Sequence, residues 1–211
     1  MANVLIEEST MSNIANAIRS KTGKSDLILP KNMASEIGKI EAMGNNDELL
    51  NSVINKSVTD IIINTNVGSY TFFDCGKINP TFGDNCSRIG AYAFQNCGGL
   101  AEINTNKVTI ILGNAFMGLN KLAKAILPNV VELNNGVFAN CKNLITLALR
   151  SATICNLKST GALLNTPIAQ GTGYIYVPKN LMEQYKVATN WTLYATQFRA
   201  IEDYPDIVGG N

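Results

Sequence analysis

The stretch "GAYAFQNCGGL", from Gly90 to Leu100, decides the fold of this 211-residue chain. It places Phe94, Cys97 and Leu100 at regular intervals, and its phenylalanine recurs with a constant period at Phe72, Phe94, Phe116 and Phe138. A constant period with apolar residues in fixed positions is typical of repeat proteins in which each repeat forms one coil of a solenoid. We therefore predict a stack of 22-residue coils whose recurring apolar side chains form the core.

Other positions keep the same period and define the coil. Apolar residues recur in two strong series and two weaker ones: Val67, Ile89, Ile111, Leu133; Ile78, Leu100, Leu122, Leu144; Thr81, Ile103, Ala125, Leu147; and Cys86, Val108, Val130, Ala152. Within a coil, "FQNCGGL" has the spacing of a short helical or 3₁₀ turn, whereas "LAEINTNKVTIIL" and "LITLALRSATI" alternate as short strands do. After Leu149 the period slips, because Leu163 lies further beyond Phe138 than one period, which predicts a degenerate last coil.

The cysteines share one position of the repeat with a leucine, in the series Cys75, Cys97, Leu119, Cys141. A free cysteine behaves as a small buried hydrophobe, so we expect Cys97 to fill the core. Metal binding, redox chemistry and a nucleophilic role are the alternatives. A disulfide is not expected, because the chain begins without an export signal.

Catalytic chemistry has little support in the sequence. The chain has no histidine and no CxxC pair, which removes the common zinc patterns and every histidine-based acid, base or nucleophile. The carboxylates occupy unrelated positions of different coils: Asp74, Asp84, Glu102 and Glu132. We predict no catalytic residue, no metal ligand and no cofactor, and hence that the protein is not an enzyme.

The coils "IGAYAFQNCGGLAEI" and "NNGVFANCKNLITLAL" resemble BspA-type leucine-rich repeats, whose pattern runs I-G-x-x-A-F-x-x-C-x-x-L-x-x-I. The resemblance covers about residues 58 to 170. Single coils depart from it, since Leu119 replaces the cysteine, Ala125 replaces an isoleucine and Phe72 follows Thr71 instead of alanine. The resemblance implies an α/β solenoid of mixed coils, each with a turn of helix and short strands.

Residues 171–211 are predicted to cap the solenoid. Tyr174 to Val177 form the pattern of a strand, and Pro178 suits the first turn of a helix. Trp191, Tyr194 and Phe198 would then cover the last coil, because an open solenoid must hide its terminal apolar face. The alternative for Trp191 is a platform on which a sugar ring stacks.

Residues 1–43 do not follow the 22-residue period and are predicted to be a small helical attachment module, followed by a linker and lead-in helix over residues 44–57. In "STMSNIANAIRSKTGK", Ser9 or Thr10 can cap a helix that carries Ile14 and Ile18 on one face. The opening "MANVLIEESTMSNIANAIRSKTG" is similar to the first segment of tail-associated proteins of phages and prophages of gut Firmicutes. That resemblance implies a place on a virion tail and attachment through the N-terminal module.

Charge and hydropathy exclude other partners. Seventeen basic and sixteen acidic residues give a net charge of +1, without the basic footprint of a nucleic-acid binder. The sequence has neither a signal peptide nor an apolar run of about 18 residues. We therefore expect a protein made in the host cytoplasm that does not insert into a membrane.

The function expected from these features is that of a non-enzymatic phage tail adhesin that binds a bacterial cell-surface ligand, a polysaccharide in the first place or a protein. The alternatives are a structural tail protein or a bacterial surface module for protein–protein interaction. A homo-oligomer, for example a trimer, is expected on the particle. The candidate binding residues are the outward strand residues that align from coil to coil: Glu102, Asn104, Lys124, Ile126, Thr146 and Ala148.

Overall fold

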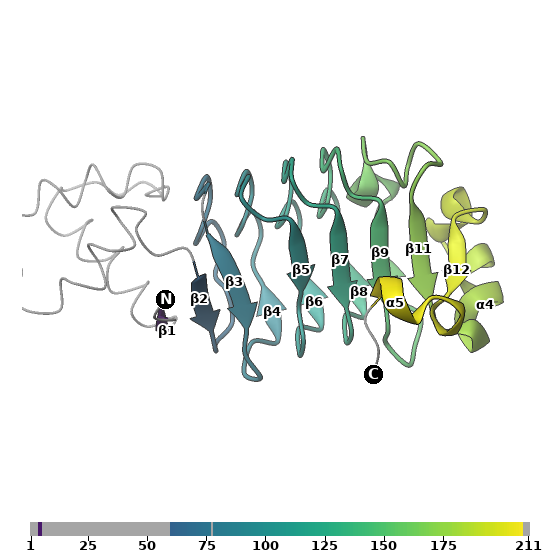
Figure 1. The fold of residues 1–211 in the computed structure, drawn as a ribbon, viewed down its shortest axis with the longest axis horizontal. Coiled ribbons are helices and arrows are strands. Elements are labelled where there is room, and N and C mark those ends of the chain that lie inside the picture. The colour runs from purple at the N-terminus through teal and green to yellow at the C-terminus, as the bar shows by residue number, and fades with distance from the viewer. Residues whose placement is uncertain (1–3, 6–59, 77, 209–211) are drawn as a thin grey trace, which may run out of the picture.

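The computed structural model describes residues 4–5, 60–76 and 78–208, whose strands form three parallel sheets (Figure 1). The predicted N-terminal helices and the lead-in helix lie outside the described residues. Only the strand β1 (Val4–Leu5) is described there, and its backbone pairs with β2 (Asp60–Ile63). Strand β2 pairs in turn with β3 (Asn79–Phe82), which completes the N-terminal sheet.

The other two sheets lie on opposite sides of the repeat region (Figure 1). The front sheet has the order β12-β11-β9-β7-β5, formed by Phe198–Ala200, Tyr174–Val177, Thr146–Leu149, Lys124–Leu127 and Glu102–Asn104. The back sheet has the order β10-β8-β6-β4, formed by Asn156–Leu157, Glu132–Leu133, Ile110–Ile111 and Arg88–Ile89.

The helical elements of the described ranges are short and lie at the C-terminal end. One 3₁₀ helix, η1 (Thr160–Leu163), belongs to the last coil. The others follow β11: η2 (Lys179–Leu181), α4 (Met182–Val187), η3 (Trp191–Tyr194), η4 (Ile201–Asp203) and α5 (Pro205–Val208).

The strand register follows the period of the sequence. In the front sheet Glu102 pairs with Lys124, and Lys124 pairs with Thr146, so each partner lies one period further along the chain. The back sheet makes the same step from Arg88 to Ile110. One period therefore contains one front strand and one back strand, and the strands of successive periods pair in parallel with equivalent residues side by side.

The connection from a back strand to the next front strand differs from the prediction. Residues 91–96 form successive turns instead of a helix. Tyr92 and Asn96 adopt left-handed backbone angles, with φ of 60° and 61°, which interrupt any helix. The Phe94 N–H then donates to the Ala115 carbonyl of the next coil at 2.7 Å, so the turns also bond from coil to coil.

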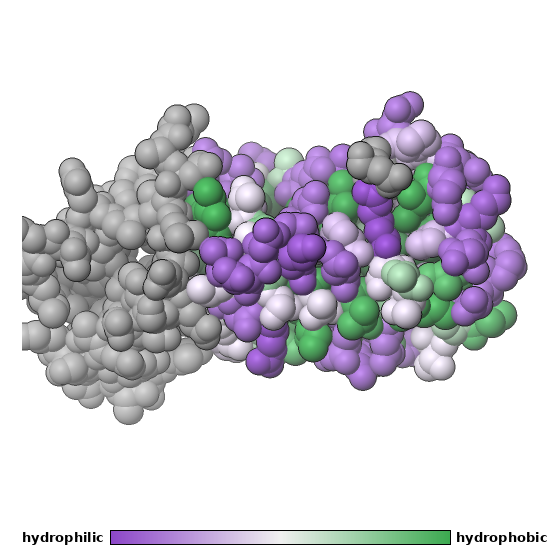
Figure 2. Space-filling view, turned by 90° about the horizontal axis from the view of Figure 1, so that it is seen from below, coloured by the Kyte–Doolittle hydropathy of each residue, from purple (hydrophilic) through white to green (hydrophobic). Residues whose placement is uncertain are grey.

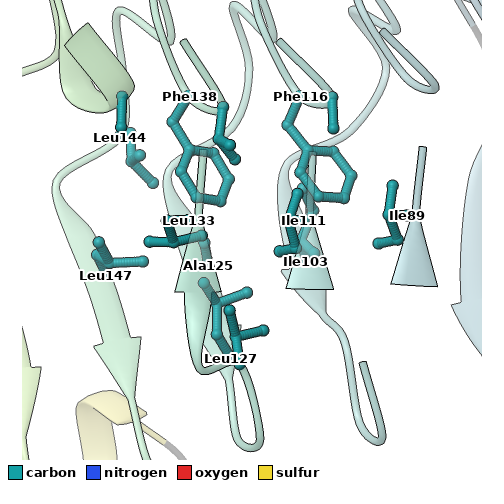
Figure 3. Close-up of a cluster of buried hydrophobic side chains, with 14 of the residues drawn as sticks. Ile89, Ile103, Ile111, Phe116, Ala125, Leu127, Leu133, Phe138, Leu144 and Leu147 are labelled. Atoms are coloured by element: carbon teal, nitrogen blue, oxygen red, sulfur yellow. The ribbon is translucent and has the colours of Figure 1, made fainter. Parts of the chain in front are cut away.

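The predicted phenylalanine ladder is confirmed. Phe72, Phe94, Phe116 and Phe138 are buried, and consecutive rings stack with centroids 5.1, 5.4 and 5.6 Å apart. Figure 3 shows Phe116 and Phe138 side by side, above aliphatic side chains that come from the strands of successive coils. The core therefore runs through the repeat region as parallel ladders of like side chains.

Two members of the weaker series are not core residues. Thr81 and Ala152 are exposed, and Phe82 and Cys155 are buried instead. The reason is a change in connection length at each end. Ile61 pairs with Pro80, which is less than one period away, and Glu132 pairs with Asn156, which is more than one period away. The period changes only in the front strands at the first point, because Val67 still bridges Ile89 and Phe72 still stacks on Phe94.

A proline explains why the N-terminal sheet and the front sheet are separate. The Gly83 N–H donates to the Ile63 carbonyl at 2.8 Å, so Gly83 and alternate residues of β3 face β2. Successive residues of a strand direct their backbone groups to opposite neighbouring strands, so the backbone of Pro80 faces the next coil instead of β2. Because proline has no N–H, β3 cannot offer a full hydrogen-bonding edge to β5.

Candidate functional site

The candidate site is the outer face of the front sheet, where strand alternation displays one set of side chains. In β5, Ile103 is buried, whereas Glu102 and Asn104 are exposed. Strand pairing extends these two residues into two rows. The first row is Glu102, Lys124, Thr146 and Tyr174, and the second row is Asn104, Ile126, Ala148, Tyr176 and Arg199. The structure thus brings all six predicted binding residues together as neighbours in these rows.

The first row is polar and partly open to solvent. Lys124 Nζ lies 3.0 Å from Glu102 Oε1, an ion pair between adjacent coils. Further along, Tyr174 is 39% exposed, and the Arg199 guanidinium lies 4.2 Å from the centroid of its ring. Thr146, between these groups, is only 7% exposed. The row therefore offers charged, hydroxyl and aromatic groups at its two ends.

The second row is covered over most of its length. Ile126, Ala148 and Tyr176 are 6%, 0% and 4% exposed and form an apolar cluster with Ile201 and Tyr204. These last two residues belong to the segment 201–208, formed by η4 and α5, which we call the cover segment. Burial beside Tyr204 raises the pKa of the Tyr176 hydroxyl. Ile126 and Ala148 are thus not accessible to a ligand while the cover segment is in place.

Sequence reasoning placed Ile126, Thr146 and Ala148 at the surface because their strand positions point outward. It missed the cover segment, which lies far away in the sequence. One signal was present: three adjacent outward positions carry apolar or aromatic side chains, Ile126, Ala148 and Tyr176. A solvated face would seldom have such a cluster.

The end of the repeat region is sealed by hydrogen bonds from the cap. The Tyr185 hydroxyl accepts from the Cys155 N–H at 2.8 Å, and Trp191 Nε1 donates to the Cys155 carbonyl at 2.7 Å. Asn190 Nδ2 donates to the Leu157 carbonyl at 2.7 Å. These backbone groups lie at the edge strand β10, where a further coil would otherwise bond. Trp191 is fully buried, so its ring packs inside the protein and is not a platform on which a sugar stacks.

The thiols lie in the core as predicted. Cys86, Cys97, Cys141 and Cys155 are fully buried, and only Cys75, at the start of the series, is partly exposed. The Cys97 thiol donates to the Phe72 carbonyl at 2.9 Å, and the Cys141 thiol to the Phe116 carbonyl at 3.1 Å. Burial raises the pKa of Cys86 to about 11 and that of Cys141 to about 12, so these thiols are neutral at pH 7.

Among the described residues, no group of three or more histidine, cysteine, aspartate or glutamate side chains is placed to hold a metal ion. No helix within the described ranges is both long enough and apolar enough to span a membrane.

Seen from below, the surface of the repeat region is largely hydrophilic, with small hydrophobic patches between hydrophilic side chains (Figure 2).

Comparison with known families agrees with this geometry. Residues 65–169 match the BspA type leucine rich repeat region in six copies. The repeat region of this chain therefore belongs to the BspA-type leucine-rich repeat family. Comparison with curated proteins gives no match.

Proposed function

We propose that this protein is a non-enzymatic adhesion module in which a solenoid of BspA-type repeats binds a bacterial cell-surface polysaccharide through the outer face of its front sheet. The observation that carries the proposal is the pair of rows, in which Glu102, Lys124 and Asn104 lie on neighbouring strands and point outward. Neighbouring strands are about 4.8 Å apart.

Such a surface suits an extended polymer. Carboxylate, ammonium and amide groups can each form hydrogen bonds with sugar hydroxyls, and the exposed Tyr174 ring offers an apolar face at the other end of the first row. Individually weak contacts add when one polymer meets several of them at once. High affinity at any single residue is not required.

The setting that we propose is a phage tail. Residues 1–43 would attach the chain to the particle, residues 44–57 would link it to the repeats, and residues 58–170 would carry the binding face, closed by the cap at 171–211. The support for this setting is the similarity of the opening residues to tail-associated proteins. Several copies on one particle, as in a homo-oligomer, would multiply the weak contacts.

A second candidate function, binding of a protein surface, is favoured by the covered half of the same face. Ile126, Ala148 and Tyr176 already pack against the protein side chains Ile201 and Tyr204. The outer face can therefore accept apolar side chains as well as polar groups. A bacterial surface module or a structural tail protein would use the face in this way.

The test compares two matched lysines on opposite sides of the repeat region. Lys124 pairs with Glu102 at 3.0 Å on the front sheet, and Lys158 pairs with Glu132 at 3.2 Å on the side of the back sheet. Both are surface ion pairs, so Lys124→Ala and Lys158→Ala should each change the free energy of unfolding by only about 0.5 kcal/mol.

We expect Lys124→Ala to weaken adsorption of the full chain to purified host envelope several-fold and Lys158→Ala to leave it unchanged. Equal adsorption of both variants would reject the front sheet as the binding face. Adsorption that survives removal of the envelope polysaccharide, but not protease treatment of the envelope, would favour the protein-binding alternative.

A further inference from the structure

We infer that the cover segment, residues 201–208, is a displaceable intramolecular cover that closes the second row until the cell-surface polysaccharide takes its place. This inference rests on the proposed function, because it concerns access to the same face. In Figure 1 the label α5 marks this segment in front of the lower ends of the front-sheet strands.

The cover segment packs on the front sheet through a small apolar cluster. Within the described chain it adds no strand to the front sheet, because β12 ends at Ala200. Ile201 and Tyr204, which are themselves only partly buried, pack against the apolar cluster, and the Tyr204 ring meets Tyr176 edge to face with centroids 5.5 Å apart. The apolar cluster that it forms is separate from the main core.

The polar anchors of the cover segment also lie at the surface. The Glu202 carboxylate accepts a hydrogen bond from the Lys179 N–H, at 3.1 and 3.0 Å to its two oxygens. Lys179 Nζ lies 3.6 Å from Asp203 Oδ1, with both side chains more than half exposed. Water can replace such contacts at little cost.

The cap just before it is held very differently. Tyr185 and Trp191 are fully buried in the main core, and each forms a hydrogen bond with the backbone of Cys155. The cap therefore belongs to the repeat region, whereas the cover segment lies on its surface. Release of the cover segment would uncover Ile126, Ala148 and Tyr176 without disturbing the coils. A ligand could then contact exposed side chains on more strands of the front sheet.

The experiment measures access to the covered row in the full chain. Ile126→Cys places a thiol under the cover segment, and Ala148→Cys is a second probe if the first variant does not fold. Each is combined with Tyr204→Ala, which removes an anchor, or with Ile207→Ala, a control in the same segment that is 40% exposed and outside the cluster. Maleimide labelling of each site is followed by peptide mass mapping.

We expect Tyr204→Ala to raise the labelling rate of the probe at least tenfold, Ile207→Ala to leave it unchanged, and the thermal midpoint of the chain to stay the same in both. If the cysteine probe is labelled only when the whole chain unfolds, in the Tyr204→Ala and Ile207→Ala variants alike, the inference is wrong. The cover segment would then unfold together with the rest of the protein.

Adsorption to host envelope separates this inference from the proposed function. If Tyr204→Ala raises both labelling and adsorption several-fold, the cover regulates the binding face. If labelling rises but no variant adsorbs, the cover is supported and the adhesion proposal fails. If every variant adsorbs equally although labelling rises, access to the second row has no role in binding and the regulatory inference is wrong.

Discussion

The middle coils and the C-terminal cap satisfy the same backbone groups in different ways. Between middle coils, the backbone itself does so: the Ser87 carbonyl accepts a hydrogen bond from the Thr109 N–H, and the Thr109 carbonyl accepts one from the Val131 N–H. At the cap the stack of coils ends, and side chains replace the next coil, with Tyr185 and Trp191 bonded to the N–H and carbonyl of Cys155.

The difference explains why one region is periodic in sequence and the other is not. A coil can be repeated because its backbone bonds need no particular side chain, and only the core positions are constrained. The cap needs hydroxyl, indole and amide groups at fixed places, so each residue is specific to its position. Both regions prevent an exposed strand edge that would otherwise pair with another chain.

The largest effect is expected in the middle of the ladder. Phe116 is fully buried and stacks on Phe94 and Phe138, with centroids 5.4 and 5.6 Å away. Phe116→Ala should lower the free energy of unfolding by about 3–5 kcal/mol, since it removes a buried aromatic ring and leaves a cavity. Chemical denaturation measures the change, and a loss under about 1 kcal/mol would contradict the ladder.

A smaller effect is expected in the cap, from the loss of a single hydroxyl. Tyr185→Phe keeps the ring but leaves the Cys155 N–H without its acceptor. An unsatisfied buried donor should cost about 1–3 kcal/mol in the free energy of unfolding. The control is Tyr174→Phe on the exposed outer face, which should change stability by less than about 0.5 kcal/mol. Equal effects at both sites would mean that the cap does not replace a coil through hydrogen bonds.

The smallest effect should have the opposite sign. Thr105 occupies the same position of the repeat as Leu127, is fully buried, and its hydroxyl has no hydrogen-bond partner within the described part of the chain. Thr105→Val keeps the shape and removes the unsatisfied group, so it should stabilise the chain by about 1 kcal/mol. Thr105→Ser, which keeps the hydroxyl and loses the methyl group, should destabilise it by about 1 kcal/mol. A destabilising valine would show that the hydroxyl has a partner.

The sequence predicted the parts of the fold that repeat. The phenylalanine ladder followed from the period, because stacked parallel strands force equivalent residues into register. The strand at Tyr174–Val177 followed from its own residue pattern, and the late position of Leu163 marked where the period slips. The left-handed residues that turn a predicted helix into a run of turns were not evident, because Tyr92 is not a residue type that signals such a conformation.

The candidate site was predicted only in part, for a related reason. Register alone placed Glu102, Asn104 and Lys124 on one face, and the structure gives the same placement. Register could not reveal that the chain returns over Ile126 and Ala148, since that contact joins segments far apart in the sequence and depends on no repeat. Tertiary contacts of this kind depend on side-chain packing between distant segments and leave no periodic pattern in the sequence.

The most direct measurement of the central claim is an amide chemical-shift map of the full chain during titration with purified envelope polysaccharide. We predict that the shifts gather on β5 and β7, around Glu102, Asn104 and Lys124, and extend to Tyr174 at the far end of the first row. Shifts confined to the back sheet, around Arg88, Glu132 and Asn156, or no saturable shift at any residue, would contradict binding by the outer face of the front sheet.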